Sequence, residues 1–231
     1  MMPPLKILFK YPCRGREAMF FESLDSLNNN IRDRNNYLIS LTLDTDDEIL
    51  NHPEVIQRIS KYPNTQIEWG LSESKIHAIN RSFPDYDFDV IVCWSNDMFA
   101  TFYGFDDVFR AEILNKFGND GMDGLAHFPE EDAKHWLNVL YVATRKYFDR
   151  FGYIYHPSYK SLWADNESME VAKLLGKYHY FGTPGLFVHK NAAYTKYGLP
   201  RDQMFEEQQS LWPVDEKNYH DRKVRNFDLN L

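Results

Sequence analysis

A single carboxylate, Asp97, follows a run of apolar residues in the sequence VIVCWSNDM (90–98). Such a run is typical of a buried strand, and the small polar residues Ser95 and Asn96 mark its end. A carboxylate held at the end of a buried strand can bind a hard divalent cation, because such cations prefer oxygen ligands. A turn or a helix N-cap would explain the same three polar residues without any metal.

Charged residues also follow the other apolar runs in the first half of the chain: they are Arg14, Arg16, Asp44 and Lys75. Gly15, between the two arginines, lets the backbone approach a ligand closely. Cations and a metal suit the phosphates of a nucleoside diphosphate, and a carboxylate suits its base or ribose. Structural alternatives stay open as well: the arginines could be solvated surface charges, the lysine an exposed residue at a helix start, and Asp46 and Asp47, which follow Asp44, could cap the next helix.

The elements that would position these residues alternate between strands and helices. Buried strands are expected at residues 5–9, 37–44, 65–70 and 89–95. Helices are expected at 16–30, at 47–62 with an interruption at Pro53, and at 74–83. This order predicts an α/β fold with a mostly parallel central sheet, covered by helices on both faces. Ligands of such sheets bind beyond the carboxyl ends of the strands, so the charged residues would meet at one edge.

The second half of the chain is less regular. A strand is expected at 123–128, a strand-like piece that passes into a helix at 137–155, and a short helix at 168–178. The tail from Pro200 onward is polar. Without repeats or a linker, the sequence predicts one domain over residues 1–231, in which 200–231 wrap the surface.

Composition limits the class of protein. Of the 231 residues, 43% are hydrophobic and 16% aromatic, which excludes a disordered chain. The net charge of −8 does not suggest a broad nucleic-acid-binding face. Two cysteines, no apolar stretch of about 18 residues and no signal-peptide pattern lead to the expectation of a cytoplasmic protein.

Five segments, in the expected order, resemble motifs of a GT-A glycosyltransferase of the broad family 2 type. They are KILFKYPCRGR, LISLTLDTDDE, SKIHAIN, VIVCWSNDM and YHPSYKSLWADNE, which together cover roughly residues 5–190. The resemblance implies a single-domain GT-A fold and transfer of a sugar from a UDP- or GDP-sugar to an acceptor hydroxyl group. It also implies a divalent cofactor, Mn²⁺ or Mg²⁺.

In this resemblance, VIVCWSNDM stands where the family has its Asp-x-Asp metal motif. Ser95 replaces the first Asp, so Asp97 is the one acidic ligand of the motif, and metal dependence is open. Members of the family often supply a late histidine to the metal. His189, which follows the apolar sequence GLFV, is the candidate, with His179 and His220 as rivals.

The resemblance also assigns the chemistry and the donor contacts. Asp165 matches the second residue of the family's Glu-Asp motif, with Ala164 in the first position. It would act as the general base of an inverting transfer, with Glu167 as the alternative base; Asp165 or Asn166 would also cap the following helix. Asn80 would shape a turn. The expected nucleotide-sugar contacts are Tyr11, Pro12, Arg14, Arg16, Asp44, Lys75, Trp94, Ser95 and Asn96.

Other functions stay open at this point. The alternatives are a non-catalytic sugar-nucleotide or carbohydrate-binding module, a nucleotidyltransferase, and a glycosyltransferase that acts on nucleic-acid bases. The net charge disfavours a nucleic-acid partner, although basic residues gather near the C-terminus. Sugars stack their C–H faces on aromatic rings, so four aromatic residues are candidates for a sugar pocket as well as for the core: Trp69, Trp94, Tyr155 and Trp163.

Overall fold

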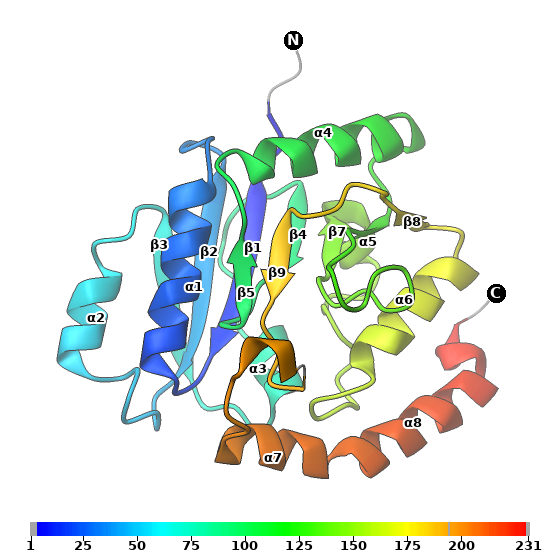
Figure 1. Cartoon of the computed structure of the whole chain (residues 1–231). Coiled ribbons are helices and arrows are strands. Elements are labelled where there is room, and N and C mark those ends of the chain that lie inside the picture. Colours follow the sequence, from blue (N-terminus) through cyan, green and yellow to red (C-terminus); the bar gives the residue numbers. More distant parts are fainter. Residues whose placement is uncertain (1–3, 194, 230–231) are drawn as a thin grey trace.

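A computed structural model describes residues 4–193 and 195–229 (Figure 1). Its centre is a seven-stranded sheet with the strand order β3-β2-β1-β4-β7-β6-β8. Every neighbouring pair is parallel except the two that involve β7, which is antiparallel to β4 and to β6. A two-stranded antiparallel sheet, β5-β9, lies beside it. The chain therefore has the α/β fold with a mostly parallel sheet that the sequence predicts.

The first half of the chain alternates between strands and helices as expected. Its elements are β1 (Ile7–Cys13), α1 (Glu17–Asn30), β2 (Tyr37–Asp44), α2 (Pro53–Ile59), β3 (Thr65–Gly70), α3 (Lys75–Asn80) and β4 (Val90–Cys93). Several boundaries differ from the prediction: α2, α3 and β4 are shorter than expected, and two further differences change how the elements begin or end. β1 continues to Cys13 instead of ending at residue 9, and Pro53 begins α2 instead of interrupting a longer helix. Proline suits the first helical position, where its missing N–H is not needed.

The second half contains β5 (Met98–Ala100), α4 (Phe105–Phe117), β6 (Leu125–His127), β7 (Val142–Thr144), α5 (Arg145–Asp149), α6 (Ala164–Leu174), β8 (Tyr178–Tyr180) and β9 (Phe187–His189). The polar tail forms α7 (Gln203–Ser210) and α8 (Trp212–Val224). Short 3₁₀ turns occupy Gly118–Asp120, Thr195–Tyr197 and Asn226–Asp228. No helix of the described residues is long and apolar enough to cross a membrane.

Alternate residues of β1 enter two cores, one on each face of the sheet. Phe9 packs with residues of α1 and α4 on the face that is in front in Figure 1. Leu8 packs with residues of α3, α5 and α6 on the other face. Lys10, on that same face, is fully buried and donates hydrogen bonds to the carbonyls of Arg81 and Ser82 at 2.7 and 2.8 Å. These carbonyls just beyond α3 satisfy the buried ammonium group, whose pKa burial lowers to about 8.

The C-terminal helices attach to the body of the protein through buried polar groups. Asp215, on α8, is fully buried and accepts the backbone N–H groups of three consecutive residues, Lys160, Ser161 and Leu162, at 2.8–2.9 Å. In Figure 1, α7 and α8 run along the lower edge of the molecule, beyond the carboxyl ends of β1 and β4. The tail therefore borders the edge of the sheet where ligands of such folds bind.

Candidate active site

The strand order reverses beside β1, and we call the edge of the sheet at this reversal the crevice. The chain adds β2 and β3 on one side of β1 and then returns to add β4 on the other side. In open α/β sheets, ligands bind outside the carboxyl ends of the strands at such a reversal. Two segments leave the sheet here: 14–16 after β1 and 94–97 after β4.

Asp97 and His189 meet in this crevice. Their segments are joined because β5 pairs with β9, which sets Met98 opposite His189. The Nε2 atom of His189 lies 3.2 Å from Oδ2 of Asp97, and the hydroxyl group of Ser95 donates to Oδ1. The structure thus brings Asp97 and His189 together, as the sequence predicts for a metal site.

Electrostatics favours the charged forms of this pair. Burial opposes ionisation of Asp97, but the charge of His189 and its hydrogen bond outweigh burial and hold the pKa of Asp97 well below its usual range. Burial likewise opposes protonation of His189, and Asp97 outweighs it, so the pKa of His189 is raised. A carboxylate that stays ionised is ready to bind a cation, whereas His189 must first lose its proton, so binding of a metal by this pair would release a proton.

The donor set fits a divalent metal with few protein ligands. An oxygen from Asp97 and a nitrogen from His189 suit Mn²⁺, which accepts both carboxylate and imidazole ligands. No group of three or more histidine, cysteine or acidic side chains that could hold a metal occurs in residues 4–193 and 195–229. Most of the coordination shell would therefore come from a bound ligand and water.

Asp165 and Lys75 complete the cluster. Asp165 is the second residue of α6, and its Oδ1 accepts the N–H of Asn166 at 2.9 Å. Burial raises the pKa of the Asp165 carboxyl, although the positive charges of Lys75 and His189 act in the opposite direction. Lys75, exposed at the start of α3, has no ion-pair partner in the described part of the chain. Asp165 thus offers a carboxyl oxygen, and Lys75 a positive charge, to the same crevice.

Glu167, the alternative base, is not brought to this cluster. It lies two residues after Asp165 on α6, a rotation of about 200°, so it points to another side of the helix. Arg222 donates to both of its oxygens at 2.7 and 2.9 Å, and Tyr159 donates a third hydrogen bond at 2.7 Å. Glu167 is therefore a buried structural carboxylate, and Asp165 is left as the candidate base.

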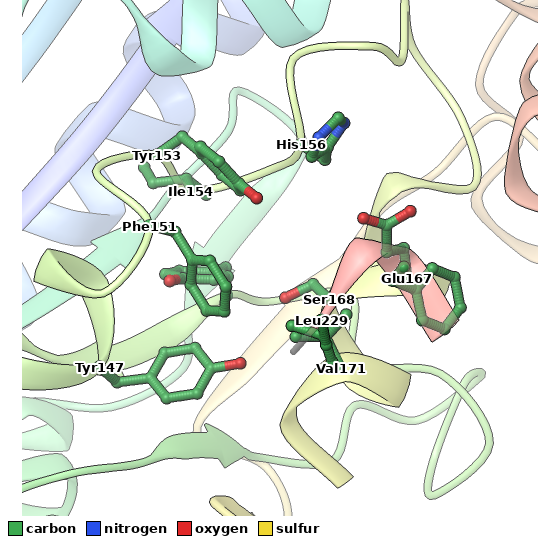
Figure 2. Close-up of a pocket in the computed structure, with 11 residues that line it drawn as sticks. Tyr147, Phe151, Tyr153, Ile154, His156, Glu167, Ser168, Val171 and Leu229 are labelled. Atoms are coloured by element: carbon green, nitrogen blue, oxygen red, sulfur yellow. The ribbon is translucent and has the colours of Figure 1, made fainter. Parts of the chain in front are cut away.

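Glu167 also lines an aromatic cavity together with Tyr153 and His156 (Figure 2). The cavity has a volume of about 30 Å³. This volume admits one or two water molecules and no sugar. The cavity is therefore not a candidate substrate site.

Asp44 lies at the end of β2 in a network that the sequence only partly predicts. Its Oδ1 accepts hydrogen bonds from Ser72 at 2.5 Å and from Arg81 at 2.9 Å, and its Oδ2 accepts one from Arg14 at 2.9 Å. Arg81 was not among the predicted site residues. Its signal was its place directly after Asn80 in the motif SKIHAIN, but an arginine after a short helix is an ordinary surface residue in sequence terms.

Both arginines of the turn after β1 have carboxylate partners. Arg14 bridges Asp44 and Asp46, with N–O distances of 2.6–3.2 Å. Arg16 binds both oxygens of Asp202, the N-cap residue of α7, at 2.5 and 2.6 Å. Gly15 and Arg16 both have positive φ angles, 58° and 49°. The turn is thus held between the end of β2 and the start of α7.

Tyr11 and Trp94 correct the prediction, because neither lies at the surface of the crevice. Both are fully buried. The hydroxyl group of Tyr11 donates to the carbonyl of Phe20, and the indole N–H of Trp94 donates to Ser23 at 3.2 Å. The reason is that β1 extends to Cys13, so Tyr11 is an inward-facing strand residue. Three other expected contacts are partly exposed at the crevice: Pro12, Ser95 and Asn96.

The remaining sequence candidates, Asn80, His179 and His220, make structural contacts. Asn80 accepts the N–H groups of Ile154 and Tyr155 and donates to the carbonyl of Tyr155, so it shapes that loop as expected. His179 packs against Phe181, with ring centroids 4.5 Å apart. The ring of His220, on α8, packs against that of Trp163, with their centroids 5.8 Å apart. Neither rival histidine pairs with Asp97 in the described residues.

Similar solved structures identify the fold. A mannosyltransferase from Pyrobaculum calidifontis, in complex with GDP-Man and Mn²⁺, matches with a TM-score of 0.63 at 15% identity, over 85% of this chain and 60% of that one. TarS of S. aureus (residues 1–349), in complex with UDP-GlcNAc, matches with a TM-score of 0.62 at 11% identity, over 91% and 66% of the two chains. The chain has a GT-A-like glycosyltransferase fold.

At these identities the similarity shows the GT-A-like fold alone. No protein-family model matches the sequence, and no curated protein matches it. The chain spans about 60% of the length of the first solved structures that it matches. Any activity of this chain must therefore be inferred from the residues of the crevice.

Proposed function

We propose that this protein is an inverting glycosyltransferase, which moves a sugar from a UDP- or GDP-sugar to an acceptor hydroxyl group. The observation that carries the proposal is the hydrogen-bonded pair of Asp97 and His189 after β4, with Lys75 and Asp165 near enough for charges to act between them and this pair. The GT-A-like fold supports it, since structures with this fold hold GDP-Man and UDP-GlcNAc.

Asp165 is proposed as the general base. Its carboxylate would accept the proton of the acceptor hydroxyl group while that oxygen attacks the anomeric carbon of the donor sugar. The bond between the anomeric carbon and the diphosphate breaks in the same step, and the diphosphate leaves with the electron pair. Attack from the face opposite the leaving group inverts the anomeric configuration. A pKa raised by burial makes Asp165 a better proton acceptor than an exposed aspartate.

The leaving diphosphate needs positive charge near it. Lys75 supplies a side-chain ammonium group without an ion-pair partner in the described residues. Asp97 and His189 are the residues that would hold a divalent cation, which when bound neutralises the negative charge of the diphosphate. Asp44, fixed by Arg14 and Arg81 at the end of β2, is proposed to bind the base of the nucleotide.

A thermal-shift screen tests the proposal at its first step. A ligand that binds only the folded state raises the free energy of unfolding by RT ln(1 + [L]/Kd). We expect UDP or GDP with Mn²⁺ to raise the melting temperature, and adenosine to leave it unchanged. If no nucleoside diphosphate shifts the melting temperature with or without Mn²⁺, the glycosyltransferase proposal is wrong.

A further inference from the structure

A group of aromatic rings lies directly before Asp165 in the sequence and against α8 in space. The ring centroids of Trp163 and Trp212 are 5.4 Å apart with an angle of 73° between the planes, and those of Trp163 and His220 are 5.8 Å apart. Trp212 is 43% exposed, His220 is exposed and Trp163 is partly buried. We call these three residues the aromatic ledge.

The backbone beneath the aromatic ledge is held in place by buried groups. Asp215, on the first turn of α8, accepts the N–H groups of residues 160–162, and the N–H of Ile76 donates to the carbonyl of Lys160 at 3.2 Å. The same segment thus connects α8 to the start of α3, where Lys75 lies. The ledge is therefore fixed relative to the proposed active site.

Trp163 has a backbone conformation that a bulky residue rarely adopts. Its φ is 63° and its ψ is −10°, at the N-cap of α6. Its indole N–H has no hydrogen-bond acceptor among the described residues, so ring contacts hold the side chain. Strained conformations of this kind cluster at ligand-binding sites, because the surrounding structure must maintain them. Here the turn places the indole with α8 while Asp165, two residues later, faces the crevice.

We infer that the aromatic ledge binds a saccharide, the acceptor of the proposed transfer, beside Asp165. The inference rests on the proposed function. A pyranose ring offers a C–H face to an aromatic ring and hydroxyl groups to polar neighbours. Glu216, four residues after Trp212 and four before His220 on α8, supplies such a polar neighbour on the same face of the helix. A lipid tail would instead need a continuous apolar groove, so the ledge suits a carbohydrate better.

The test uses the full chain and simple saccharide probes without an aromatic group: the methyl glycosides of glucose, galactose, mannose and N-acetylglucosamine. Their binding is measured by saturation-transfer NMR and titration, and nucleoside diphosphate binding by calorimetry in parallel. We expect at least one glycoside to bind. Trp212→Ala should weaken that binding about tenfold, and Trp212→Phe, which keeps a ring, should retain most of it. UDP or GDP binding should not change in either variant.

Val214→Ala is the matched control, because Val214 is 61% exposed on the same first turn of α8 but has no ring. Equal glycoside affinity in Trp212→Ala and Val214→Ala would overturn the inference, and so would the absence of binding by all four glycosides. Loss of nucleotide binding in a folded Trp212→Ala variant would place the ledge in the donor site and also contradict it. Failure of the proposed function has a different signature: no nucleoside diphosphate binds, while glycoside binding persists and still depends on Trp212.

Discussion

The imidazole of His189 lies 3.2 Å from the carboxylate of Asp97, although 92 positions separate them in the sequence. The short β5-β9 sheet brings them together, and Ser95 and Lys190 fix Asp97 further through its side chain and its carbonyl. This pair lies beside β1, where the strand order reverses, and it is the centre of the proposed active site.

Removal of either member of the pair should abolish the effect of metal on nucleotide binding. In Asp97→Ala and His189→Ala, we expect the gain in UDP or GDP affinity caused by Mn²⁺ to fall by at least about tenfold, because each variant loses a protein ligand. Calorimetric titrations with and without Mn²⁺ measure this gain. His179→Ala is the control. An undiminished Mn²⁺ effect in both variants would place the metal elsewhere.

The Glu167–Arg222 pair should matter for stability and not for chemistry. Both side chains are buried, and Glu167→Gln leaves the Arg222 guanidinium with the half-exposed Asp228 as its remaining carboxylate partner, so the change should cost about 3 kcal/mol, the lower end of the range for a broken buried pair. Replacing both residues with methionine should recover most of this loss, since it removes both charges. Urea denaturation gives the free energies of unfolding. Normal stability with lost sugar transfer in Glu167→Gln would instead make Glu167 the base.

Asp202 should compete with the donor for Arg16. The two side chains form a bidentate pair in which Arg16 is partly buried. Asp202→Asn keeps a side-chain oxygen to cap α7, but it leaves the guanidinium available for a diphosphate. We expect nucleoside diphosphate affinity to rise about tenfold, the worth of one charge-assisted hydrogen bond. Asp221→Asn, on the same tail, is the control in calorimetry. Weaker binding in Asp202→Asn would show that the pair organises the site.

Asp165 should make the protein less stable as the pH rises. Burial raises the pKa of this carboxyl in the folded state, so the folded protein retains a proton that the unfolded chain loses near pH 3.9. Stability is therefore lost from about pH 4 upward until the folded-state pKa is passed. Asp165→Asn should be more stable than the wild type at pH 7, and the difference should shrink toward pH 4. Denaturation curves of both proteins at pH 4 and pH 7 check this. A variant that is less stable than the wild type at pH 7 would contradict the prediction.

The sequence predicts the elements that depend on local pattern. The strand 37–44 matches β2, and the alternation of strands and helices up to β4 gives the parallel half of the sheet. Local pattern does not fix where β1 ends, because Pro12 and Cys13 resemble a turn. For that reason the sequence predicts Tyr11 in the site, whereas the structure places it in the core.

Contacts between distant segments could not be predicted in this way. Arg222 and Glu167 are 55 positions apart, and Arg81 and Asp44 are 37 apart. Glu167 resembles a surface residue in the first turn of a helix until α8 is placed against it. The polar tail has no periodic apolar pattern that predicts α7 and α8. Two of the buried residues of α8, Asp215 and Arg222, are charged, and α7 buries Phe205 alone. Motif resemblance selects Asp97, His189 and Asp165; the fold brings Asp97 and His189 into contact, and the role of Asp165 stays a prediction.

The most direct test of the proposed transfer is a single-turnover assay of Asp165→Asn, with a nucleotide sugar that binds and an acceptor that the wild-type protein uses. A general base contributes roughly 10²- to 10⁴-fold to the rate, and donor binding does not depend on it. We predict a rate loss in that range with an unchanged dissociation constant for the nucleotide sugar and an undiminished melting temperature. An Asp165→Asn variant that transfers sugar at the wild-type rate would contradict the account.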